Sequence, residues 1–167
     1  MLADSKTYAE LVAGFRWDLP NHLNMARQVC DDWAEKAPDQ IAIIELRGGQ
    51  GGDRQIVTYR DLRWMADGLA HHLLACGVQH GDRIGVLRMQ GAWTAVAHIA
   101  CWKIGAISVP LFKLFGPDAL LSRLDDAGVQ LVLTDADGAE RLCDWASAGR
   151  SLMVPENERL FVRRFDT

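Results

Sequence analysis

The chain has 167 residues and a net charge of −4, with 49% hydrophobic and 24% charged residues. A chain of this length can bury roughly 70% of the surface of its unfolded form, so one domain with a true core is expected. The acidic balance argues against a nucleic-acid binder, which needs clustered basic groups to displace counterions from phosphates.

Two segments bear on membrane association and compartment. The first ten residues include Asp4, Lys6 and Glu10 and hold no apolar run, so they do not form a signal peptide. Residues 93–115 are rich in apolar side chains, but charged residues, glycine and Pro110 interrupt them. A membrane-spanning helix needs about 20 mostly apolar residues without such interruptions. We therefore expect a cytoplasmic protein without a membrane span.

In chain order, the N-terminal region predicts two helices. Residues 8–15 place apolar side chains at helical spacing, and the alternation from Phe15 to Leu19 predicts an extended segment before Pro20. Asn21 is suited to cap the next helix, whose apolar residues recur at intervals of three and four until Ala37.

A β-hairpin is predicted next, from strands at 41–44 and 55–58. The connection from Arg47 to Arg54 is rich in glycine. Phosphate-binding loops lead from a strand into a helix, whereas this segment leads into a second strand and lacks Lys-Ser or Lys-Thr, so a hairpin turn is the favoured interpretation.

From Thr58 onward, helices and strands alternate. Thr58 and Asp61 resemble a capping box, and the helix that they begin ends at Gly77. Short joints between helices and strands are typical of a mainly parallel sheet with crossover helices. The fold class is therefore α/β, with the N-terminal hairpin as an antiparallel edge. The expected strands are 83–87, 106–110, 130–134 and 151–154, and the expected later helices are about 92–103, 117–127 and 138–146.

Three parts of the chain follow from these patterns: an N-terminal extension at 1–20, an α/β unit at 21–154 and a charged tail at 155–167 without an obvious element. The strands at 106–110 and 130–134 are so apolar that we expect both to be buried on two faces.

The four cysteines and five histidines suggest no metal or redox site. No two cysteines form a C-x-x-C pair, and we expect small buried thiols in a reducing compartment instead of a disulfide. His71 and His72 are adjacent on a helix and point in different directions, and His98 lies on an apolar helical face. The cysteines are Cys30, Cys76, Cys101 and Cys143.

No complete catalytic motif is present in the sequence. Neither G-x-S-x-G nor a G-x-G-x-x-G after a strand occurs, which leaves a serine nucleophile and a dinucleotide site without support. Most of the six tryptophans fall on apolar helical faces, so we expect core packing. Trp93 and Trp102 are alternatively suited to border an apolar ligand pocket.

Three segments together carry a family resemblance. They are Leu23–Asp31, Val57–Ile84 (Val-Thr-Tyr-Arg-Asp-Leu, then Gly-Val-Gln-His-Gly-Asp-Arg-Ile) and Lys103–Asp135, which contains Lys-Ile-Gly-Ala and Phe-Gly-Pro-Asp-Ala-Leu. In this order and spacing, over about residues 20–140, they resemble the N-terminal part of the large domain of the AMP-binding adenylate-forming superfamily. Within it, the run resembles the acetyl-CoA and medium-chain acyl-CoA synthetases.

The resemblance implies an acid–thiol ligase of fatty acid metabolism. Such enzymes convert a carboxylate and Mg-ATP to an acyl-adenylate, which coenzyme A then attacks. The family's phosphate loop, its Tyr-Gly-x-Thr-Glu segment and its catalytic lysine match no position here. No catalytic or metal-binding residue is therefore assigned, and this chain alone is expected to be inactive and to bind neither ATP, Mg2+ nor coenzyme A tightly.

Two alternatives remain open. One is a non-catalytic α/β binding or interaction module with the same fold. The other keeps the superfamily but changes the branch, to an adenylation domain of peptide synthesis or an aryl-CoA ligase. As a piece of a larger domain, the chain would leave apolar surface uncovered, so we expect self-association.

The resemblance also implies four residues near coenzyme A. Phe112, Lys113 and Leu114 match the segment after the strand that lines this site in acetyl-CoA synthetases. Arg141 is the nearest match, one position out of register, to the basic residues that approach the 3′-phosphate in that branch. This sequence has Phe-Lys-Leu where that branch has Phe-Gly-Gly. Two interpretations of Lys113 stay open, an anion ligand or a side chain that extends to solvent.

Overall fold

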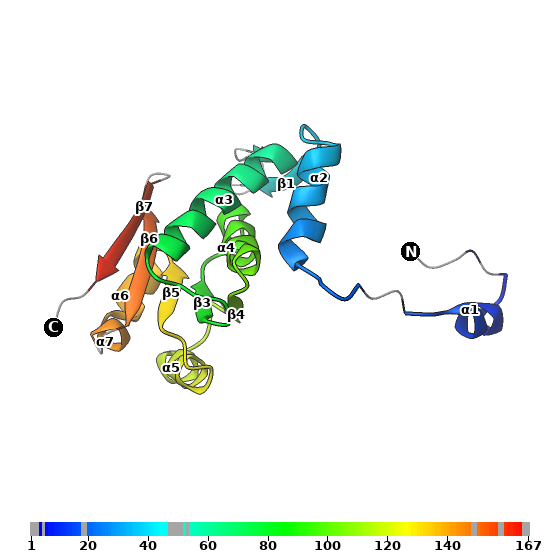
Figure 1. The fold of residues 1–167 in the computed structure, drawn as a ribbon. Helices are drawn as coiled ribbons and strands as arrows, with labels where there is room; N and C mark the ends of the chain where they lie inside the picture. Colours follow the sequence, from blue (N-terminus) through cyan, green and yellow to red (C-terminus); the bar gives the residue numbers. More distant parts are fainter. Residues whose placement is uncertain are drawn as a thin grey trace.

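The computed structural model describes residues 4, 6–17, 20–46, 52, 54–147, 150–156 and 159–164. Helix α1 (Tyr8–Gly14) begins at Thr7, whose hydroxyl accepts a hydrogen bond from the backbone N–H of Glu10. This helix was predicted. It contains no buried residue and stands apart from the rest of the chain (Figure 1).

The second helical segment consists of a π-helical turn, η1 (Arg27–Asp31), followed by α2 (Asp32–Lys36). The prediction that Asn21 caps it is wrong. The side-chain oxygen of Asn24 accepts the backbone N–H of Ala26 at 2.9 Å, and its amide nitrogen donates to the carbonyl of Trp102 at 3.0 Å. The first of these bonds is local and caps the helix, whereas the second spans 78 residues.

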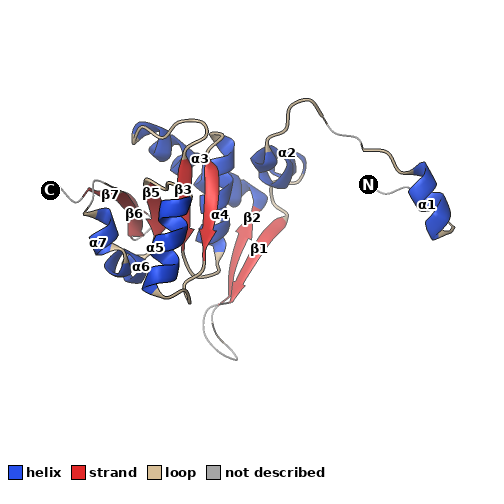
Figure 2. Cartoon of the chain, turned by 90° about the horizontal axis from the view of Figure 1, so that it is seen from below, coloured by secondary structure: helices blue, strands red, loops and turns tan. Residues whose placement is uncertain are grey.

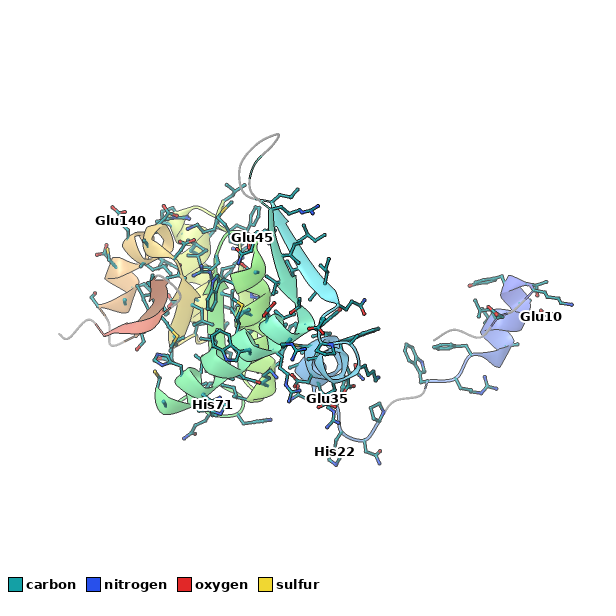
Figure 3. The ribbon with its side chains drawn as sticks, turned by 90° about the horizontal axis from the view of Figure 1, so that it is seen from above. Glu10, His22, Glu35, Glu45, His71 and Glu140 are labelled. Atoms are coloured by element: carbon teal, nitrogen blue, oxygen red, sulfur yellow. The ribbon has the colours of Figure 1, made fainter. Side chains whose placement is uncertain are left out.

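Strands β1 (Ile41–Leu46) and β2 (Arg54–Thr58) form the predicted antiparallel hairpin. They make a separate two-stranded sheet, so the expectation of an edge on the main sheet is wrong (Figure 2). The hairpin instead contacts a helix: the Glu45 carboxylate accepts the N–H of Ala92 at 3.0 Å (Figure 3). The glycine-rich connection lies almost wholly outside the described residues.

Helix α3 (Tyr59–Ala75) begins at the predicted capping box. The Thr58 hydroxyl accepts the N–H of Asp61, and the Asp61 carboxylate accepts the N–H of Thr58 at 3.0 Å. Gly77 follows the helix with a φ of 88°, a left-handed conformation that favours glycine. Both predicted ends are therefore confirmed.

The main sheet has five strands in the order β4-β3-β5-β6-β7. The first four are parallel, as predicted, and β7 is antiparallel to β6. The expectation that the tail lacks an element is wrong, because residues 159–164 pair with β6. The strands are β3 (Arg83–Leu87), β4 (Ile107–Leu111), β5 (Leu131–Thr134), β6 (Ser151–Glu156) and β7 (Arg159–Arg164).

Helices cover both faces of this sheet. Alternate strand residues face alternate sides: Leu131 and Leu133 of β5 pack in the cluster that includes α3 and α4 (Ala92–Lys103), while Val132 packs in the cluster of α5 (Pro117–Asp126), α6 (Ala136–Arg141) and α7 (Cys143–Ala146). The single helix predicted at 138–146 is broken at Leu142, which is buried.

The two strands expected to be buried on both faces differ. All four residues of β5 are buried, which confirms the prediction for this strand. Strand β4 lies at the edge of the sheet, and Ile107 is 53% exposed, so the prediction for β4 is wrong. Pro110 is consistent with an edge position, because proline has no N–H to give to a second neighbour.

Several side chains are less buried than expected. Trp145 is buried, but Trp17, Trp33 and Trp64 are exposed, which contradicts the expectation for most tryptophans. Cys30 and Cys101 are buried, whereas Cys143 is exposed, and all four thiols are free. Among the described residues no helix has the length and hydropathy to cross a membrane, and no group of three potential metal ligands occurs.

Candidate functional site

The carboxyl ends of β3, β4 and β5 form the candidate site. From β3 the chain passes through α4 to β4, and from β4 through α5 to β5, which pairs with the other side of β3. The crossover helices α4 and α5 therefore lie on opposite faces, and the strand order reverses between β3 and β5. In open α/β sheets, ligands bind outside the strand ends at such a switch point.

Arg88 follows β3 and joins it to β5. Its guanidinium donates to the carbonyl of Thr134 at 2.6 Å, and the Thr134 hydroxyl donates to the carbonyl of Leu87 at 2.8 Å. Burial lowers the pKa of Arg88, while the carboxylates of Asp135 and Glu45 act in the opposite direction. The strand ends are thus tied together by a partly buried cation.

Lys113 follows β4 and is bound by two carboxylates. Its ammonium donates to Asp135 at 2.6 Å and also to Asp137, and its side chain is only 9% exposed. Burial by itself lowers the pKa of Lys113, but hydrogen bonds and attraction from both aspartates outweigh burial and raise it. The pKa of Asp135 is lowered, because Lys113 and the N–H of Gly138 outweigh the opposing effect of burial.

Arg141 reaches the same loop from α6. Its guanidinium donates to the carbonyl of Lys113 at 2.7 Å and to the carbonyl of Phe115. The guanidinium of Arg123 in α5 lies 4.2 Å from the ring centre of Phe115, a cation–π contact. Phe115 in turn meets Phe112 edge-on at 5.8 Å, and its N–H donates to the Phe112 carbonyl. The loop 112–116 is therefore held from α5, from α6 and from the end of β5.

Apolar side chains face outward at these strand ends. Phe112 is 52% exposed and Leu114 is 81% exposed, and Met89 after β3 is also exposed. Leu87 and Leu111, which precede these segments, are directly paired in the sheet. The arrangement thus turns its cations inward and its apolar groups outward.

The structure brings together the four residues singled out in the sequence. Phe112, Lys113 and Leu114 share one loop, and Arg141 binds its backbone. Extension of Lys113 to solvent is wrong, since its ammonium is paired and its side chain largely buried. Its role as an anion ligand stays a prediction.

Three side chains of this strand-end cluster were missed: Arg88, Asp135 and Asp137. A signal for them did exist in the sequence. Arg88 and Asp135 directly follow two apolar strands, and parallel strands end at one edge of a sheet. What the sequence lacked was the strand order, which places β5 close enough for Asp135 to reach Lys113 across 22 residues.

A second lysine cluster lies before the amino end of β4, away from the carboxyl ends of the strands. Lys103 ends α4, its side chain is 12% exposed, and its ammonium is bound by Asp31 of η1 and by Asp67 of α3 at 2.8 Å. Burial alone lowers the pKa of Lys103, but hydrogen bonds to both aspartates reverse the effect and raise it. This cluster joins helices and lies away from the strand ends that form the candidate site.

Comparison with known proteins identifies the family. A family profile described as AMP-binding enzyme matches residues 30–160, which is most of the chain. The chain belongs to this family. Acetyl-coenzyme A synthetase of Desulfatibacillum aliphaticivorans is 37% identical over 123 residues, covering 74% of this chain and 19% of that protein. Acetyl-coenzyme A synthetase of Halorhodospira halophila is 36% identical over 135 residues, covering 81% and 20%.

A solved structure supports the same assignment. The crystal structure of Brucella canis acyl-CoA synthetase matches with a TM-score of 0.73 and 25% sequence identity, over 82% of this chain and 26% of that chain. The α/β fold with a parallel sheet and a hairpin is thus that of an acyl-CoA synthetase. The chain spans about a fifth of the length of the curated relatives that it matches.

Proposed function

We propose that this chain is the N-terminal α/β unit of an AMP-forming acyl-CoA synthetase, which joins a small carboxylate to coenzyme A with ATP through an acyl-adenylate. The observation that carries the proposal is the match to acetyl-coenzyme A synthetases at 36–37% identity over three quarters or more of this chain. The short- to medium-chain branch and a cytoplasmic location belong to the proposal, and the complete protein would use ATP and Mg2+.

The strand-end segment with Phe112, Lys113, Leu114 and Arg141 is proposed as the coenzyme A side of the synthetase. Coenzyme A supplies the thiol that accepts the acyl group. The exposed Phe112 and Leu114 fit the uncharged part of such a ligand. The paired ammonium of Lys113 and the guanidinium of Arg141, which donates to two carbonyls, do not fit the capture of a phosphate.

The test compares the 167-residue chain with the complete product of its gene. ATP–pyrophosphate exchange and acyl-CoA formation would be measured with linear acids from acetate to octanoate. The complete product is expected to form acyl-CoA from at least one acid, and the chain alone none. A complete product that activates no carboxylate would contradict the proposal, and exchange by the chain alone would contradict the expected dependence on further sequence.

We also propose that the isolated chain associates with a second copy of itself through the hairpin. Ile44 and Ile56 are directly paired on β1 and β2, and both are exposed, as is Leu46. An apolar strip of this kind promotes contact between identical surfaces. Sedimentation should show dimers that Ile44→Lys abolishes, while Lys36→Met on the exposed face of α2 leaves them unchanged. A monomer at high concentration would contradict the proposal.

A further inference from the structure

In the loop 112–116 the ammonium of Lys113 is directed inward to two carboxylates. An anion-binding loop would direct such a cation toward the ligand. We propose that Lys113 is a positioning residue: its ion pairs with Asp135 and Asp137 fix the loop after β4 so that Phe112 and Leu114 are presented to the ligand. Coenzyme A would then be met at this loop by apolar contact and not by the charge of Lys113. The inference rests on the proposed function for the identity of the ligand only.

The charges around Lys113 are unfavourable for an anion. The ammonium of Lys113 contacts Asp135 at 2.6 Å and also Asp137, so the three groups together carry one net negative charge. A phosphate approaching Lys113 would have to displace a carboxylate, and like charges at this distance repel. Asp135 is also held by a second hydrogen bond, because its carboxylate accepts the N–H of Gly138 at 2.9 Å.

Hydrogen bonds constrain the backbone of the loop 112–116. Arg141 binds the carbonyls of Lys113 and Phe115, and Phe115 donates its N–H to the Phe112 carbonyl at 3.0 Å. Lys113 adds ion pairs from this loop to Asp135 and Asp137, at the junction of β5 and α6. Its side chain therefore ties the turn to the end of β5, beside the contacts that Arg123 of α5 and Arg141 of α6 make with the turn.

The loop 112–116 exposes two apolar side chains. With Lys113 directed inward, its two neighbours Phe112 and Leu114 are directed outward, at 52% and 81% exposed. Immobilising a loop before binding removes the cost of ordering its side chains from association. A lysine at this position thus favours a ligand by holding its neighbours in place.

The test measures loop order and ligand discrimination separately. Backbone ¹⁵N order parameters of the 167-residue chain are compared for the wild type, Lys113→Met, Lys113→Arg and the surface control Lys36→Met. We expect Lys113→Met to lower the order parameters of residues 112–116 from about 0.85 to below about 0.6. Lys113→Arg should restore most of the order, and Lys36→Met should change nothing. Unchanged order parameters in Lys113→Met would overturn the positioning role.

The ligand is tested in the complete gene product, with coenzyme A and with 3′-dephospho-coenzyme A. Lys113→Met should raise KM for both thiols by the same factor, about fivefold, with little change in kcat. A KM increase confined to coenzyme A would show that Lys113 binds the 3′-phosphate and would overturn the inference. A gene product without synthetase activity would refute the proposed function, whereas the order parameters would still decide whether Lys113 positions the loop.

Discussion

A lysine bound by two aspartates lies near each end of β4, and the two clusters connect different parts of the fold. Lys103 precedes the strand and Lys113 follows it, each lysine is almost buried, and each is bound by two aspartates. The partners of Lys103 come from η1 and α3, which are helices distant in sequence. Both partners of Lys113 come from the short segment after β5, beside a loop that exposes apolar groups.

The comparison shows that the role of an ion pair depends on the structural elements to which its partners belong. Lys103 joins three helical elements that pack in the larger core cluster, so its loss would loosen the body of the fold. Lys113 joins one surface loop to a strand end, so its loss would free the loop and leave the body intact. The predictions below separate these two roles.

The largest effect is expected from Lys103→Met. It removes the close cation of Asp31 and Asp67 and leaves them the longer contacts with Arg63. Removing one partner from the largely buried pair of Lys103 and Asp31 should lower the free energy of unfolding by about 3 kcal/mol. Urea denaturation measures it.

The matched control is Arg63→Met. Arg63 contacts Asp31 and Asp67 at 3.8 and 3.7 Å and is 41% exposed, so its loss should lower the free energy of unfolding by less than about 1 kcal/mol. Equal losses in the two variants would mean that Lys103 is an ordinary surface charge.

A somewhat smaller effect is expected from Gly138→Ala, beneath the Lys113 loop. A Cβ at this position would lie 1.9 Å from the Thr134 hydroxyl oxygen, which donates to the Leu87 carbonyl. Breaking that buried bond and overpacking the strand end should lower the free energy of unfolding by about 2 kcal/mol.

Gly68→Ala is the control, because a Cβ at this position of α3 meets nothing within 4 Å. It should raise the free energy of unfolding by up to about 1 kcal/mol, since alanine favours a helix over glycine. If Gly138→Ala were equally stabilising, the strand end would be looser than the described packing.

The smallest effect is expected from pH. The pKa of Asp135 lies below its ordinary value of 3.8, so its contribution to stability is present above pH 3.8 and is lost as the pH falls through the lowered value. The pKa of Lys113 lies above 10.5, so the contribution of the ammonium is present below pH 10.5 and is lost only at higher pH.

Stability attributable to the Lys113 pair should therefore be constant between about pH 5 and pH 9 and should fall in acid. Asp135→Asn should remove part of the fall in free energy of unfolding below pH 4, seen in urea denaturation at a series of pH values. An acid-induced loss of the same size in Asp135→Asn and the wild type would assign the loss to other carboxylates.

Local features of the fold were predictable and long-range ones were not. The capping box of Thr58 and Asp61 and the glycine stop at Gly77 depend on neighbours in sequence, and both were confirmed. The edge position of β4, the pairing of β7 with β6 and the hydrogen bond from Asn24 to the Trp102 carbonyl depend on contacts that periodicity does not encode.

The candidate site follows the same division. Phe112, Lys113, Leu114 and Arg141 were found through resemblance in sequence, and they do lie together. The direction of Lys113 was not predictable, because it depends on β5 lying next to β3 and bringing Asp135 to the same edge. Topology therefore decided whether a cation faces solvent or a carboxylate.

Native-state hydrogen exchange on Lys103→Met and Lys113→Met, measured side by side, tests the division of roles most directly. Lys103→Met should accelerate the most protected amides of α3 and α4 by about 100-fold, in keeping with a loss of about 3 kcal/mol, and Lys113→Met should leave them unchanged. Lys113→Met should instead accelerate the amide of Phe115, which donates to the Phe112 carbonyl. Acceleration of the same amides by both variants would contradict the account.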